Sequence, residues 1–107
     1  MRTYKNPILY ADYSDPDVVR VGEDYYYGIL LFYLYSGVPL LHSRDLVHWE
    51  LINHCVKKLP FEKYALPCHG SGTWAPSIRY HEGTFFVFIP LVDEGILVAR
   101  SKDLRGI

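Results

Sequence analysis

The chain of 107 residues lacks an excess of either charge, because 11 basic residues stand against 12 acidic ones. A basic surface for nucleic acid or for an anionic membrane is therefore not expected. Residues 1–7 contain no long apolar core, so no signal peptide is predicted. A chain expressed as it stands is expected to stay in the cytoplasm, while its compartment in a natural context is left open.

Long apolar runs and helical periodicity are also missing. The longest uncharged run, residues 25–43, is interrupted by Gly28, Gly37 and Pro39, which excludes a membrane-spanning helix. No window shows sustained apolar residues at spacings of three and four. The sequence therefore favours strands over helices throughout.

Metal-binding spacings are scarce as well. Cys55 and Cys68 are the two cysteines, with no CxxC motif, so a zinc site is not predicted and a disulfide between them is left open. The five histidines have neither HxH nor HxxxH spacing. No metal and no cofactor are expected.

What the sequence does contain is hydrophobic and aromatic residues, at 50% and 16% of the chain, with ten tyrosines. Short β-rich runs are separated by Gly, Pro, Asp and Asn, which predicts an all-β fold. The expected strands cover residues 16–21, 24–33, 38–43, 47–53, 76–81, 84–90 and 95–101, with hairpin turns at 21–24 and 81–84.

The sequence also repeats itself. Residues 16–27 align with 76–87, and residues 41–46 align with 99–104. Antiparallel four-stranded units that repeat along a chain are typical of β-propeller blades. The predicted organisation is an N-terminal segment at 1–15, a first blade at 16–53, a connecting loop at 54–73 and an incomplete second blade at 74–107.

A partial propeller has apolar blade faces that need cover. The chain could belong to a larger protein, join a complementary propeller fragment, or assemble with copies of itself as a homo-oligomer. A small self-contained β-sandwich is the alternative architecture.

Three carboxylates stand close together at Asp12, Asp15 and Asp17. The proline after Asp15 favours an extended conformation for that residue, so its carboxylate is displayed where a strand begins. A turn-forming role is the alternative, since Asp is common in turns. The second repeat has Ala75 at the equivalent position, so the repeat does not require a carboxylate there. Asp12 and Asp17 are predicted to be solvated or turn-forming.

Several motifs together resemble glycoside hydrolase family 43, a family of β-xylosidases and α-L-arabinofuranosidases with a five-bladed β-propeller fold. The motifs are Asn6-Pro7-Ile8-Leu9, Ser14-Asp15-Pro16-Asp17-Val18, Asp24-Tyr25-Tyr26, His42-Ser43-Arg44-Asp45-Leu46-Val47-His48-Trp49, Gly72-Thr73-Trp74-Ala75-Pro76-Ser77-Ile78 and Glu82-Gly83-Thr84-Phe85. They cover nearly the whole chain in the order and spacing of the family.

The resemblance implies that Asp15 is the general base that activates water, and that Phe32 and Trp74 line the sugar subsite. For Trp74 a place in the core is an equal alternative. His69 is a further candidate for substrate binding, beside glycines in the long connection. In the family, the general acid and a pKa-modulating Asp come from later blades, and neither has a counterpart here. The chain alone is therefore expected to be nearly inactive on xylosides and arabinosides.

One segment departs from the family. Residues 28–31 read Gly-Ile-Leu-Leu, where similar enzymes carry small and hydroxyl-bearing residues. An uncharged run with high β-propensity suits a buried interface. An engineered or excised blade module that self-assembles is therefore the alternative function, and carbohydrate binding without catalysis is a third.

Overall fold

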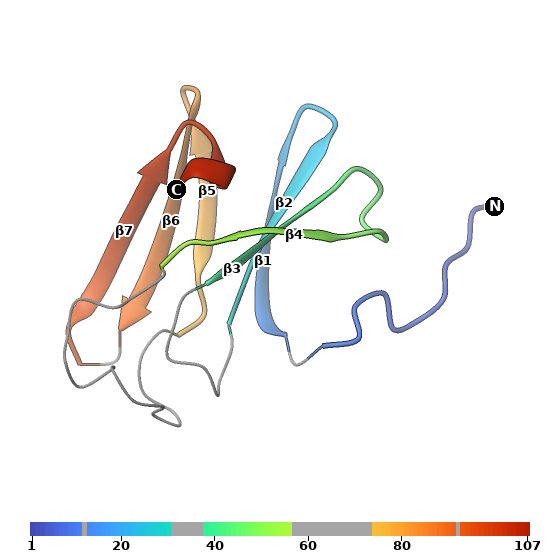
Figure 1. Ribbon diagram of the computed structural model, residues 1–107, viewed down its shortest axis with the longest axis horizontal. Coiled ribbons are helices and arrows are strands. Elements are labelled where there is room, and N and C mark those ends of the chain that lie inside the picture. Colours follow the sequence, from blue (N-terminus) through green and yellow to red (C-terminus); the bar gives the residue numbers. More distant parts are fainter. Residues whose placement is uncertain (12, 31–37, 57–73, 92) are drawn as a thin grey trace.

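The computed structural model describes residues 1–11, 13–30, 38–56, 74–91 and 93–107 (Figure 1). Two antiparallel sheets make up the described part, ordered β1-β2-β3-β4 and β5-β6-β7. The strands are β1 (Ser14–Val21), β2 (Asp24–Leu30), β3 (Pro39–Ser43), β4 (Glu50–His54), β5 (Ser77–His81), β6 (Thr84–Leu91) and β7 (Gly95–Ser101), followed by the short 3₁₀ helix η2 (Leu104–Gly106). The predicted all-β fold, with a four-stranded and a three-stranded unit, is confirmed.

The strand boundaries follow the sequence pattern closely except at β4. This strand was expected from residue 47 and begins at Glu50. The Asp45 carboxylate accepts the backbone N–H groups of Val47 and His48 at 2.9 and 2.8 Å, which holds these residues in a turn. Side-chain hydrogen bonds to the backbone thus outcompete strand pairing there. The predicted strand residues after Leu30 and the connection at 57–73 lie outside the described residues.

Both predicted hairpins form with two-residue loops. Gly22 has φ +63° in the first loop, and Glu82 and Gly83 have φ +48° and +78° in the second. Positive φ at the centre of a two-residue loop matches the right-handed twist of the flanking strands. The two hairpins point toward the same end of the molecule (Figure 1).

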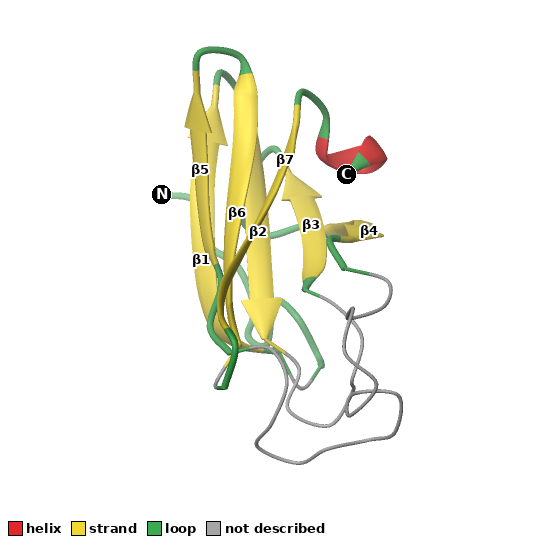
Figure 2. Ribbon diagram, turned by 90° about the vertical axis from the view of Figure 1, so that its left-hand side faces the viewer, coloured by secondary structure: helices red, strands yellow, loops and turns green. Residues whose placement is uncertain are grey.

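The two sheets pack face to face, and β1 and β2 run in directions similar to β5 and β6, whereas β4 crosses them (Figures 1 and 2). Side chains alternate between the faces of each strand. The Tyr26 ring packs on Phe85 of the second sheet, with 4.9 Å between the ring centroids. The next residue, Tyr27, packs on Trp49 on the opposite face, with 5.0 Å between the centroids. The core between the sheets consists of Val38, Leu40, Cys55, Ile78, Phe85, Val87, Ile89 and Leu104.

Gly28 stands on the face of β2 that packs toward the second sheet. A Cβ atom there would lie 3.6 Å from the Cγ of Pro76 and 3.6 Å from a methyl group of Val38. That is ordinary van der Waals contact, so a methyl group would fill the remaining space and a larger side chain would push the sheets apart. The glycine of the unusual segment 28–31 therefore serves the packing between sheets.

The repeated Ser-basic-Asp-Leu sequence forms a similar turn in both units. Ser43 Oγ accepts the N–H of Asp45 at 3.1 Å, and Ser101 Oγ accepts the N–H of Asp103 at 3.2 Å. The Asn53 amide of β4 then donates to the carbonyl of Leu104 at 3.1 Å, so it ties η2 to the first sheet. The internal repeat is thus present in the hydrogen bonds as well as in the sequence.

We expect Ile89→Ala to destabilise the fold by about 2–5 kcal/mol, because it leaves a cavity in the core between the sheets. Leu51→Ala is the matched control, since Ile89 is 0% exposed and Leu51 is 48% exposed. The control should change the free energy of unfolding by less than about 0.5 kcal/mol. Urea unfolding of both variants measures this, and equal losses would show that the core is misplaced.

Candidate active site

Asp15 is exposed and lies in a β-bulge at the start of β1. Ser14 pairs with Leu30 and Asp17 pairs with Gly28, so Asp15 and Pro16 together stand opposite Ile29 alone. Pro16 has no N–H to donate, which suits a position where the ladder is interrupted. Bulges commonly re-aim a side chain next to an active site. The predicted catalytic carboxylate is therefore displayed by an irregular strand entrance.

The backbone of Asp15 has φ +48°, in the left-handed region. Asp tolerates this region better than most residues, but it remains an unfavourable conformation. Such a conformation persists where the surrounding structure determines it. Across the ladder, Ile29 is 0% exposed and anchors the partner strand of the bulge.

Asp17 is not the solvated or turn-forming residue that the sequence suggested. Its Oδ2 atom accepts the backbone N–H of Ile78 at 2.8 Å and the Nη1–H of Arg79 at 2.8 Å. The Asp17 side chain is 29% exposed. It therefore joins β1 of the first sheet to β5 of the second. Its phase with Val19 and Val21, which pack against the core, was the signal available in the sequence.

Trp74 stands just before β5, and β5 contacts β1. Both strands start at the end of the molecule opposite the hairpins, so Trp74 and Asp15 mark the entrances of neighbouring strands (Figure 1). The Trp74 backbone N–H donates to the carbonyl of Pro90 at 2.8 Å, and Trp74 is 52% exposed. Trp74 is thus not part of the described core. Phe32 and His69 lie outside the described residues.

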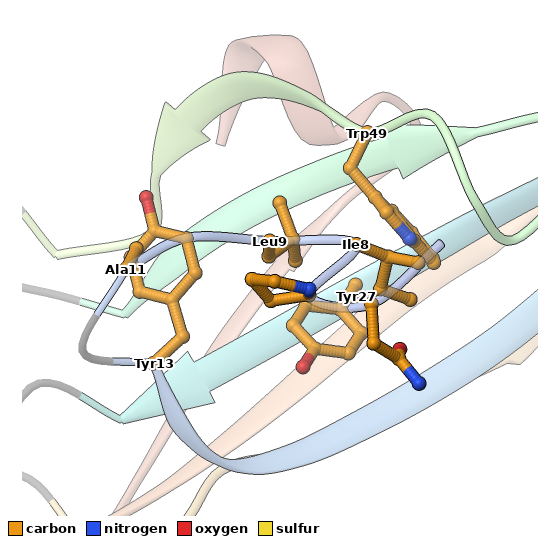
Figure 3. Close-up of a pocket in the computed structure, with 8 residues that line it drawn as sticks. Ile8, Leu9, Ala11, Tyr13, Tyr27 and Trp49 are labelled. Atoms are coloured by element: carbon orange, nitrogen blue, oxygen red, sulfur yellow. The ribbon is translucent and has the colours of Figure 1, made fainter. Parts of the chain in front are cut away.

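A pocket lies on the face of the first sheet that points away from the second sheet (Figure 3). It has a volume of about 280 Å³, and its walls are formed by Asn6, Pro7, Ile8, Leu9, Ala11, Tyr13, Tyr27 and Trp49. The N-terminal segment supplies most of this wall and covers this face of the sheet. Asp15 does not line the pocket, so the pocket and the candidate base are separate features.

Charged groups elsewhere are engaged in local contacts. Asp24 receives hydrogen bonds from His42 at 2.7 Å and Arg44 at 3.2 Å, and the His42 contact is the main cause of its lowered pKa. Hydrogen bonds from the His48 side chain and backbone lower the pKa of Asp45. Both carboxylates stabilise the hairpin end and turn regions of the first sheet.

The described residues include no group of three or more His, Cys, Asp or Glu side chains arranged to hold a metal ion. Within the same residues, the chain has no helix with the length and apolarity that a membrane crossing requires.

Two consecutive antiparallel sheets built on a repeated plan are typical of neighbouring propeller blades. The comparison with known families agrees, because the model of glycosyl hydrolases family 43 matches residues 4–107. The chain belongs to this family, and its fold is part of a β-propeller.

Curated relatives include a non-reducing end α-L-arabinofuranosidase of Bacteroides ovatus, 42% identical over 111 residues, and a β-xylosidase of Formosa agariphila, 38% identical over 108 residues. The matches cover 98% and 97% of this chain but 21% and 18% of those relatives. The chain thus spans about a fifth of their length.

Solved structures give the same result. The structure described as Bacteroides ovatus xyloglucan PUL GH43B has a TM-score of 0.81 and 35% identity, with 99% of this chain and 22% of that one covered. A bifunctional GH43-CE protein of Bacteroides eggerthii has a TM-score of 0.82 and 30% identity, with coverage of 95% and 15%.

Cys55 is a buried thiol after β4, and burial raises its pKa to about 11. In a Cys68→Ser background, we expect its alkylation at pH 8 to be about a hundredfold slower than that of an unperturbed thiol, because the reactive thiolate is scarce. Mass spectrometry after timed addition of iodoacetamide measures the rate. The same chain in urea is the control, and equal rates in both conditions would contradict the prediction.

Proposed function

We propose that this chain supplies the catalytic base, Asp15, of an inverting hydrolysis of xylosides or arabinosides. The observation that carries the proposal is the exposed Asp15 carboxylate on its bulge at the entrance of β1. Family membership and the names of the relatives, which include xylosidases and arabinofuranosidases, support this substrate class.

In this mechanism a water molecule lies between the Asp15 carboxylate and the anomeric carbon of the sugar. Asp15 takes a proton from the water as its oxygen attacks, and the glycosidic bond breaks on the opposite face of the ring. A second carboxyl group must protonate the departing oxygen, and in inverting enzymes it lies about 6.5–9.5 Å from the base. Asp17 does not suit this role, because Ile78 and Arg79 already occupy its Oδ2 atom.

The Trp74 indole is the proposed sugar platform of the site. Sugars present apolar C–H faces that stack on aromatic rings, and an exposed indole at a strand entrance offers such a ring. Phe32 and His69 stay predictions for the same subsite. The binding element and the base would then come from the first residues of two adjacent blades.

The 107 residues are proposed to be nearly inactive alone. One carboxylate cannot both activate the water and protonate the leaving group in the same step. The remaining groups would come from a longer protein, in keeping with the fifth of the relatives' length that this chain covers.

The test is a chimera in which this chain replaces the matching segment of the Bacteroides ovatus arabinofuranosidase. We expect the chimera to hydrolyse an aryl arabinofuranoside, and Asp15→Asn to lower its kcat by at least about a hundredfold, because general-base catalysis contributes about 10²–10⁴. Initial rates measured by release of the aryl group report this.

Glu23→Gln is the matched control, since this exposed carboxylate lies in the hairpin loop at the other end of β1. It should leave kcat unchanged. Full activity in Asp15→Asn, in a chimera with the thermal stability of the parent, would remove Asp15 as the base. Substantial turnover by the 107 residues alone would contradict the division of the site between two parts of a protein.

A second candidate function, self-assembly, is favoured by the outer face of β5–β6–β7. The repeat places Ile96 and Val98 at the positions of Val38 and Leu40 in the first sheet. Val38 and Leu40 are 0% exposed between the sheets, whereas Ile96 is 67% and Val98 53% exposed. The second sheet thus presents, uncovered, the face that its counterpart buries.

We propose that two copies of the isolated chain cover this face for each other. A head-to-tail contact would need the opposite face of the first sheet, which the N-terminal segment partly covers (Figures 1 and 3). The predicted interface at residues 29–31 is not supported at Ile29, which is 0% exposed within the chain itself. The proposed assembly surface is therefore on β6 and β7, and not on β2 as the sequence suggested.

Light scattering on the 107-residue chain should give the mass of a dimer, and the double variant Ile96→Glu and Val98→Glu should give a monomer, because charges cannot be buried without partners. Leu51→Glu, on the other face of the first sheet and 48% exposed, is the control and should stay dimeric. A monomeric parent chain would overturn this candidate.

A further inference from the structure

The bulge at Asp15 raises the question of what holds an exposed residue in an unfavourable backbone conformation. On one side of Asp15, the chain is fixed by the pairing of Ser14 with Leu30. On the other side, Asp17 carries the contact between the sheets, two residues along the strand. We propose that Asp17 is the positioning residue for Asp15: it holds the positive-φ backbone of Asp15 by tying β1 to β5. This inference rests on the proposed role of Asp15 as the base.

The geometry of the tie supports this role. Both bonds of Asp17 end on a single oxygen, and both measure 2.8 Å. One donor is the backbone N–H of Ile78, whose side chain is 0% exposed in the core. The Asp17 carboxylate is thus attached to a fixed point of the neighbouring sheet. Hydrogen bonds to a charged group are stronger and shorter than those between neutral groups, which suits a fixed attachment.

Arg79 strengthens the same attachment from the solvent side. Its guanidinium donates to Asp17 and also to the carbonyl of Ile78 at 2.7 Å, so one side chain bridges both partners. Opposite Asp17 in the ladder stands Gly28, which lets Pro76 of the next blade approach. The contact therefore occupies the row of the sheet immediately after the bulge.

The second repeat provides an internal comparison. Ala75 and Ser77 stand at the positions of Asp15 and Asp17. Among the described residues, Ala75 is not one of those with positive φ. The extra residue recurs in the second blade, because the Trp74 N–H donates to the Pro90 carbonyl while Ser77 pairs with Phe88, which leaves Ala75 and Pro76 opposite Ile89. The carboxylate, the positive φ and the acidic tie occur together in the first blade and do not recur at these positions of the second. An attachment that served blade packing alone would not be expected to follow the carboxylate.

The test measures the backbone of Asp15 by NMR in the 107-residue chain. In Asp17→Ala we expect the amide order parameter of Asp15 to fall from about 0.85 to below about 0.6, and its φ-dependent coupling to lose the left-handed value. Amide exchange in β6 should stay slow, which separates a local release from unfolding. Asp17→Asn, which keeps an acceptor, should show a smaller fall.

Two further variants define the comparison. Arg79→Gln removes the ion pair but leaves the Ile78 bond, so it should loosen Asp15 partially even where Asp17→Ala does not fold. Asp24→Asn is the control, because it removes the same charge from a carboxylate bonded to His42 and Arg44 within the first sheet. Unchanged order parameters at Asp15 in both Asp17→Asn and Arg79→Gln would overturn the proposal.

The catalytic readout uses the chimera. A displaced base should lower kcat about a hundredfold with little change in KM, since a misplacement of about 1 Å can have that effect. If Asp15→Asn keeps full activity while Asp17→Ala loosens the bulge, the proposed base is wrong and the positioning contact stands. If Asp15→Asn is inactive and Asp17→Ala leaves both the bulge and kcat unchanged, the positioning role is wrong and the base stands.

Discussion

Packing of one sheet on the other is the contact on which the rest of this structure depends. A sheet of three or four strands is stable when one of its hydrophobic faces packs on another layer. Here Val38 and Leu40 meet Ile78, Val87 and Ile89, all of them 0% exposed. Because this contact fixes β1 relative to β5, it also fixes where the irregular entrance of β1 can lie. The display of Asp15 is thus a consequence of blade packing.

The sequence predicted what depends on neighbours along the chain. Alternation and turn residues gave the strands and both hairpins, and the repeat gave two blade units. The start of β4 was wrong because Asp45 bonds to the backbone of Val47 and His48, and a polar turn of this kind overrides a β-rich pattern. The alternating pattern predicts which residues can form a strand, whereas the hydrogen bonds of the Asp45 carboxylate decide where β4 begins.

The role of Asp17 could not be predicted from local patterns, because its partner Ile78 is 61 residues away in the chain. An acidic residue is expected to face solvent, whereas alternation with Val19 and Val21 places Asp17 on the face of β1 that packs toward the second sheet. Burial of an acidic group requires partners, and those partners are visible only once the sheets are docked. The candidate base Asp15 was named from a family motif, and the structure shows it exposed at the entrance of β1. Its positive φ angle was not predicted, because the proline that follows favoured an extended backbone and that expectation was wrong.

The internal repeat separates residues that recur in both blades from residues that occur in one blade alone. Ser43 and Asp45 recur as Ser101 and Asp103 with the same kind of hydrogen bonds, as expected where the architecture itself needs them. Asp15 and Asp17 do not recur, although the strands around them do. The two blades have the same strand arrangement. A residue type that occurs in only one of them therefore points to a role that the blade architecture does not require. By this criterion we propose that the two carboxylates at the entrance of β1 work together, with Asp15 acting on the substrate and Asp17 holding Asp15 in place.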